Sequence, residues 1–129
     1  NRQPVICYLL KEEEIEKLKE ITPYTFHSKN MLLVCYDKEI SYKRKNDNYD
    51  FGVIDASIVT TYMMLKITAL GLGSCWVGDF KPDNLKQVFN LEKNIIPISL
   101  LPFGYISNDS KPSVFHSERK EMERFKIEN

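Results

Sequence analysis

Three apolar runs along the chain have the length and composition of strands. They are residues 4–10 ("PVICYLL"), 31–36 ("MLLVCY") and 95–105 ("IIPISLLPFGY"). Short apolar runs bounded by proline or charged residues, and rich in β-branched or aromatic side chains, are typical of buried strands. Because the runs are almost uniformly apolar, both faces of the sheet that they form are expected to be covered.

Helical periodicity appears between these runs. Residues 11–21 place Ile15, Leu18 and Ile21 on one face of a charged surface helix that ends at Thr22 and Pro23. Residues 81–91 predict a second, short helix with a Pro-Asp start. Strands that alternate with helices indicate a single domain over residues 1–129, of the α+β class with α/β-type layering.

The longest predicted helix, about residues 53–70, is apolar nearly all round. One apolar stripe along the helix contains Ile54, Ile58, Tyr62, Leu65 and Ala69. The stripe is widened by Met63, Met64 and Ile67. A helix of this kind needs apolar surroundings on more than one side, so it is enclosed either by the core of the chain or by a partner subunit. Asp55, Lys66 and the glycines that follow argue against a membrane span.

The segment 37–52 is polar, has no clean period and is predicted to be a long loop with a possible functional role. Tyr36, Tyr42, Tyr49 and Phe51 border it. These rings either cover an aromatic substrate or anchor the loop, and the sequence leaves both interpretations open.

Composition narrows the class of protein. The chain is 43% hydrophobic and carries 18 basic and 18 acidic residues, so it lacks the basic surplus typical of nucleic-acid or anionic-membrane binding. Cys7, Cys35 and Cys75 form no C-x-x-C pair and lie in apolar runs, which predicts reduced, buried thiols in a cytoplasmic protein. His27 and His116 are expected to be solvated, and no metal site is expected. No signal peptide is visible at the start of the sequence.

The segment 71–80, "GLGSCWVGDF", contains three glycines. It is not a dinucleotide fingerprint, because it follows a helix and its third glycine falls two positions late, and it lacks the Gly-Lys-Ser/Thr ending of a P-loop. A helix C-cap at Gly71 and a turn at Gly73 account for two of the glycines. Neither feature accounts for Gly78, which lies beside Asp79. A glycine at this position would let a flat ligand approach the backbone and receive a main-chain hydrogen bond.

Four segments in order carry a resemblance. They are "NRQP" at the start, "GLGSCWVG" after the apolar helix, "ISLLPFGY", and "ERKEMERF" near the end. Together they resemble the FMN-dependent nitroreductase family, most closely its short anaerobe-type members, with Val5 where that family usually has tryptophan. In the family, a phosphate-binding Arg-Arg-Ser helix precedes the first of these segments. The chain begins at Asn1, so we expect a domain that lacks its N-terminal helices.

The resemblance implies a mostly antiparallel central sheet flanked by helices, in a homodimer with FMN sites at the interface. It also implies an oxidoreductase that passes a hydride from NAD(P)H, either NADH or NADPH, to flavin N5 and on to a nitroaromatic, a quinone or another small-molecule acceptor. Two alternatives stay open. One is a flavin- or nucleotide-binding module, or a cofactor-free dimer, without activity; the other is a different flavin chemistry on the same fold.

The resemblance further implies a set of cofactor-binding residues, with no catalytic side chain because the flavin carries the chemistry. The Gly78–Asp79 backbone would meet flavin N5, and the residues just before it would line one side of the ring. Amides near the chain start would meet the flavin edge across the interface, unless they are simply a solvated end. Basic residues near the chain end would meet the phosphate, unless they belong to an exposed charged helix. The full set is Asn1, Gln3, Cys75, Trp76, Val77, Gly78, Asp79, Arg119 and Lys120.

Overall fold

The computed structural model describes residues 2–121 and contains one antiparallel sheet of four strands. The strand order is β1-β2-β4-β3. The strands are β1 (Val5–Lys11), β2 (Asn30–Asp37), β3 (Gly73–Ser74) and β4 (Ile95–Gly104). The helices are α1 (Glu12–Glu16), α2 (Gly52–Ala69), α3 (Pro82–Val88) and a 3₁₀ turn, η1 (Val114–His116). The three strands expected from the apolar runs are confirmed.

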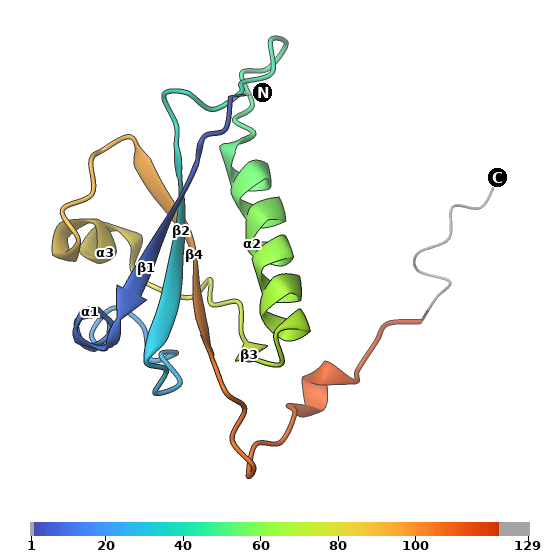
Figure 1. Ribbon diagram of the computed structural model, residues 1–129. Helices are drawn as coiled ribbons and strands as arrows, with labels where there is room; N and C mark the ends of the chain where they lie inside the picture. Colours follow the sequence, from blue (N-terminus) through green and yellow to red (C-terminus); the bar gives the residue numbers. More distant parts are fainter. Residues whose placement is uncertain (1, 122–129) are drawn as a thin grey trace.

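Helices cover both faces of the sheet, with α2 on one side and α1 and α3 on the other (Figure 1). The alternation of side chains along β2 explains the two layers. Leu33 and Cys35 point into the larger core together with Leu18 and Leu85, whereas Val34 packs with the other layer, against α2. Because successive strand residues face opposite sides, one buried strand supplies both cores.

The expected helix 11–21 is shorter than its periodicity suggested. α1 ends at Glu16, and hydrogen bonds three residues apart continue the chain, including Leu18 N–H to the Ile15 carbonyl (2.9 Å) and Ile21 N–H to the Leu18 carbonyl (2.8 Å). Ile15, Leu18 and Ile21 are all buried, as predicted. Their spacing of three residues matches a turn of 3.0 residues better than one of 3.6, which explains the tighter path. The predicted helix 81–91 is likewise shortened, to α3.

The apolar stripe of α2 faces outward, not into the core of the chain. Ile58, Tyr62 and Leu65 are 51%, 70% and 62% exposed. The buried side of the helix carries small residues instead, among them Ala56 and Thr60, which let the helix approach the sheet closely. This chain therefore encloses α2 on one side only. No helix within residues 2–121 is long and apolar enough to cross a membrane.

The end of α2 shows what two of the three glycines do. Gly71 has φ of +76°, its N–H bonds to the Thr68 carbonyl (2.9 Å), and Leu72 N–H bonds to the Ile67 carbonyl (3.2 Å). This is a Schellman motif, so the predicted C-cap is confirmed. Gly73 is not in a turn, however. It belongs to β3 and pairs with Gly104 at the edge of the sheet.

The exposure of two cysteines also differs from expectation. All three thiols are free, but only Cys35 is buried, whereas Cys7 and Cys75 are exposed. Beyond β4 the chain leaves the sheet and runs away from the body of the molecule (Figure 1). Both histidines are exposed, as predicted.

Candidate cofactor site

The segment 75–79 is fixed at several points. Val77 and Leu100 exchange two hydrogen bonds of 2.9 Å, and Cys75 N–H donates to the Pro102 carbonyl (3.3 Å). On its other side the Thr22 hydroxyl donates to the Asp79 carbonyl (2.7 Å). A segment held from both sides presents its remaining backbone groups in a defined direction.

Nothing in the described residues explains why position 78 is a glycine. Gly78 is not among the residues with positive φ, and an added Cβ would meet only Trp76 Nε1, at 3.8 Å. Within residues 2–121, the main-chain N–H groups of Gly78 and Asp79 donate no hydrogen bond, and both residues are exposed. Two free donors beside open space suit a flat ligand with acceptor atoms along its edge.

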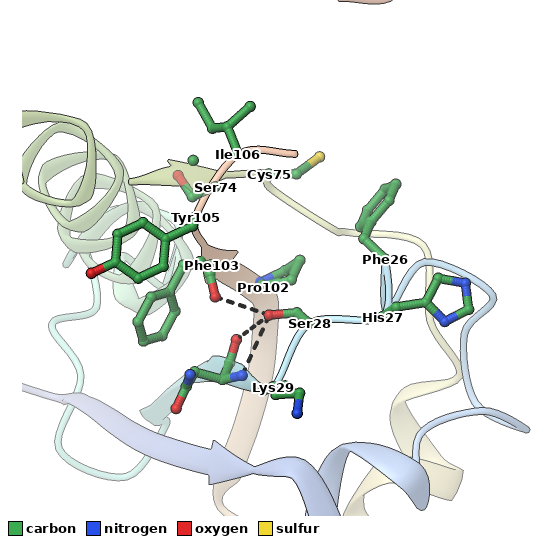
Figure 2. A pocket seen from close by; sticks show the side chains of 13 residues that line it. Phe26, His27, Ser28, Lys29, Ser74, Cys75, Pro102, Phe103, Tyr105 and Ile106 are labelled. Carbon is green, nitrogen blue, oxygen red and sulfur yellow. Dashed lines mark hydrogen bonds between the residues drawn. The ribbon is translucent and has the colours of Figure 1, made fainter. Parts of the chain in front are cut away.

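A cavity of about 420 Å³ lies next to this segment, where three segments meet: residues 26–30, 73–75 and 102–106 (Figure 2). The Ser28 hydroxyl ties two of its walls together, because it reaches both the Phe103 carbonyl (2.9 Å) and the Asn30 carbonyl (2.6 Å). Phe26 and His27 have φ of 50° and 52°. Two consecutive non-glycine residues in the left-handed region are strained, and the hydrogen bonds of the adjacent Ser28 hold this exposed wall in place.

Within one chain the predicted cofactor residues fall into three separate groups. The first is the segment 75–79, of which Cys75 alone also lines the cavity. The second is Gln3, which shares a hollow of about 280 Å³ with Asp55 and Ile58 of α2. The third is Arg119 with Lys120, both exposed on the segment beyond β4, where Arg119 Nη1 donates to its neighbour's carbonyl (2.7 Å). Asn1 lies outside the described residues.

Burial raises the pKa of the Cys35 thiol to about 12, and the nearby Cys7 thiol adds to this effect. A thiol held protonated is a weak nucleophile, so Cys35 is a core side chain and not a reactive group. No set of three His, Cys, Asp or Glu residues in the described part of the chain could hold a metal ion.

Sequence reasoning missed the loop 26–30 as a wall of the cavity. "FHSKN" follows a turn and carries no periodic pattern. Its position depends on the contact between Ser28 and Phe103, which are 75 residues apart. A local signal could have shown a loop there, but not which strand end it would face.

Comparison with known proteins identifies the family. The nitroreductase family model matches residues 9–105, and the chain belongs to this family. A nitroreductase family protein of Clostridium difficile has 35% identity and a TM-score of 0.88, over 98% of this chain and 74% of that one. A curated relative from Archaeoglobus fulgidus, provisionally named an NADH dehydrogenase/NAD(P)H nitroreductase, is 27% identical over 114 residues, 81% of this chain. The chain spans 63% of the length of that relative.

A more distant match concerns the fold. An FMN-containing oxidoreductase superimposes with a TM-score of 0.66 and 10% identity, over 82% of this chain and 58% of that one. The resemblance seen in the sequence and the expected antiparallel sheet flanked by helices are therefore confirmed.

Proposed function

We propose that the protein is an FMN-dependent NAD(P)H oxidoreductase that reduces a small acceptor. The observation that carries the proposal is the segment 75–79 in a chain of the nitroreductase family. It is anchored to β4 and to Thr22, and it presents the free N–H groups of Gly78 and Asp79 to open space. The names and the FMN of related proteins agree with this chemistry.

The residues present fit an isoalloxazine edge. Gly78 and Asp79 would donate main-chain hydrogen bonds to the ring near N5, and the absence of a Cβ at Gly78 would leave room for the ring. Cys75, Trp76 and Val77 would line one side of it. When bound, the cofactor supplies hydride-transfer chemistry, in which two electrons and a proton leave NAD(P)H for the flavin and the reducing equivalents then pass to the acceptor. Main-chain donors suit this role because they are rigid and do not titrate.

A homodimer would account for the separation of the three groups of residues. The exposed stripe of α2 offers a second copy an apolar surface, and α2 also carries the hollow that contains Gln3. Two copies packed through α2 would allow Gln3 of one chain to serve a flavin held by segment 75–79 of the other. Arg119 and Lys120 lie on a segment that runs away from its own sheet, which suits a contact with a phosphate at the interface (Figure 1).

The test is the visible absorption spectrum of the purified protein with added FMN, recorded before and after NADH and NADPH. Retained flavin whose band bleaches with either nucleotide supports the oxidoreductase. Flavin that binds but does not bleach indicates a binding module. A protein that FMN leaves colourless after gel filtration contradicts the proposal.

A Gly78→Leu variant tests the position of the ring. We expect its affinity for FMN to fall by about tenfold or more, equivalent to about 1.4 kcal/mol, since the side chain occupies the space assigned to the ring. Fluorescence titration with FMN measures the change. Stability should stay unchanged, because nothing in the described chain lies closer than 3.8 Å to the added Cβ. Gln87→Leu, which adds the same side chain at an exposed site on α3, is the control. Equal affinity in both variants would show that the ring lies elsewhere.

A further inference from the structure

Thr22 is a buried threonine whose hydroxyl bonds outside its own turn. Its main-chain N–H donates to the Leu18 carbonyl (2.9 Å), as in a helix, but its hydroxyl donates to the Asp79 carbonyl (2.7 Å), 57 residues away in the sequence. A threonine in a helical turn can instead donate to the carbonyl four residues before it. Three hydroxyls on α2 do so, those of Thr60, Thr61 and Thr68. The Thr22 hydroxyl is therefore used for a long-range contact, and the residue is only 2% exposed.

The hydrogen bonds around this hydroxyl fix its direction. The Thr22 oxygen accepts the Tyr24 N–H (3.3 Å), and its own hydrogen is donated to the Asp79 carbonyl. Within residues 2–121 the Asp79 carbonyl accepts no other hydrogen bond. The loss of the Thr22 hydroxyl would therefore leave this carbonyl free to turn.

Other bonds already join the two segments that Thr22 connects. Lys81 N–H donates to the Ile21 carbonyl (3.2 Å), and Lys81 Nζ donates to the Glu20 carbonyl (3.4 Å). Lys81 is the residue at which α3 begins, so these two bonds are sufficient to dock the start of that helix. The bond from Thr22 differs from them, because it acts on Asp79, within the segment 75–79.

Thr22 and Leu100 hold the two ends of a short span. Val77 exchanges two main-chain hydrogen bonds of 2.9 Å with Leu100, and the Asp79 carbonyl is held by Thr22. Between these fixed points lie only Gly78 and the N–H of Asp79. Glycine is conformationally permissive, so a span that contains it keeps a defined direction only if both of its ends are held. The direction of the two free N–H groups therefore depends on Thr22.

We propose that Thr22 is a positioning residue for the flavin, whose hydroxyl directs the main-chain donors of Gly78 and Asp79 toward the ring edge. This inference rests on the proposed function. N5 of oxidised flavin accepts a hydrogen bond, whereas N5 of reduced flavin carries a hydrogen and does not. A well-directed N–H near N5 therefore binds the oxidised ring more tightly than the reduced ring. Through this difference Thr22 acts on the affinity for oxidised FMN and on its midpoint potential.

The test replaces Thr22 with valine, which keeps the shape and removes the hydroxyl. Fluorescence titration gives the affinity for FMN, and reductive titration with a redox dye gives the midpoint potential. We expect Thr22→Val to bind oxidised FMN about three- to tenfold more weakly, with the affinity for reduced FMN unchanged, because a hydrogen bond to the ring loses its alignment. The potential should then rise by about 15–30 mV, since a tenfold change corresponds to about 30 mV for a two-electron couple. Thr22→Ser keeps the hydroxyl and should keep the wild-type affinity and potential.

A second measurement does not depend on FMN. NMR relaxation of the FMN-free protein gives the order parameters of the Gly78 and Asp79 N–H groups, for which about 0.85 indicates a rigid backbone and less than about 0.6 a flexible one. We expect rigid values in the wild type and in Thr22→Ser, and lower values in Thr22→Val. Thr22→Ala, which removes the same hydroxyl without placing a methyl group against the Asp79 carbonyl, should resemble Thr22→Val.

Thr60→Val is the matched control. It makes the same substitution at an equally buried residue (0% exposed), whose hydroxyl bonds to Ser99 between α2 and β4, on the other face of the sheet. This variant should be less stable than the wild type, but its flavin affinity, midpoint potential and order parameters at Gly78 and Asp79 should be unchanged.

The outcomes separate this inference from the proposed function. A wild type that takes up no FMN contradicts the proposed function, and the role of Thr22 toward the flavin with it, whatever the order parameters are. A wild type that binds FMN, with a Thr22→Val variant of unchanged affinity and potential, overturns the positioning role alone. Unchanged order parameters in Thr22→Val also overturn it. An equal loss of flavin affinity in Thr22→Val and Thr60→Val does so too, because lower stability would then account for both.

Discussion

At the level of single residues, Gly52 shows how one position sets the start of α2. A Cβ added there would lie 2.0 Å from Cδ2 and 2.2 Å from Cε2 of the Tyr36 ring. Asp50 joins the two residues, since it accepts the Gly52 N–H at 2.9 Å and the Tyr36 hydroxyl at 3.4 Å. The first turn of the helix therefore packs directly on an aromatic ring of β2, and only glycine permits that approach.

The variant Gly52→Ala should lose about 1–3 kcal/mol of unfolding free energy, because the ring or the helix start must move to admit the methyl group. Urea denaturation followed by circular dichroism measures the loss. Gly104→Ala is the control, since no atom lies within 4 Å of its added Cβ. If the two variants were equally stable, the close packing of Gly52 on Tyr36 would be wrong.

At the level of elements, the contact between α2 and β4 contains a buried polar pair. The hydroxyls of Thr60 and Ser99 lie 3.0 Å apart, and both residues are fully buried. Thr60 also donates to the Ala56 carbonyl (2.8 Å), so the Ser99 hydroxyl donates to Thr60. This bond joins the helix to the central region of the sheet and disfavours other rotations of the helix about its axis.

Replacing Thr60 with valine should cost about 1–3 kcal/mol of unfolding free energy, because the Ser99 hydroxyl loses its buried partner. Adding Ser99→Ala should recover part of the loss, and a double-mutant cycle from urea denaturation gives the coupling energy. Thr61→Val is matched to Thr60→Val: its hydroxyl makes the same kind of helical bond, to the Ser57 carbonyl (2.9 Å), but is exposed. Additive losses at Thr60 and Ser99 would show that the pair is not coupled.

At the level of the whole molecule, the exposed stripe of α2 is the strongest support for a dimer. Tyr62→Glu combined with Leu65→Glu places two charges on this stripe, and we expect the protein to sediment as a monomer in analytical ultracentrifugation where the wild type is a dimer. A buried, unpaired charge costs several kcal/mol, enough to disrupt an interface of ordinary size. Gln87→Glu on the opposite layer should leave the dimer intact. A monomeric wild type would contradict the homodimer.

Local signals in the sequence were sufficient to predict much of the secondary structure and the family of this protein. The apolar runs predicted β1, β2 and β4 because a strand buried on both faces must be apolar at nearly every position. Gly71 marked the end of α2, since the left-handed C-cap conformation favours glycine. Four short segments in order indicated the family, which comparison confirmed. Each strand, the C-cap and each of these segments depends on neighbours within a few residues.

The orientation of α2, the strand β3 and the walls of the cavity were determined by long-range packing. The apolar stripe of α2 and its small-residue face could each have met the sheet, and the close approach allowed at Gly52, Ala56 and Thr60 turned the stripe outward. β3 exists only because Gly73 meets Gly104, 31 positions later in the pairing with β4. The walls of the cavity depend on a similar long-range contact, between Ser28 and Phe103. A periodic pattern shows which residues share a face, but which face is buried depends on the surface that it meets.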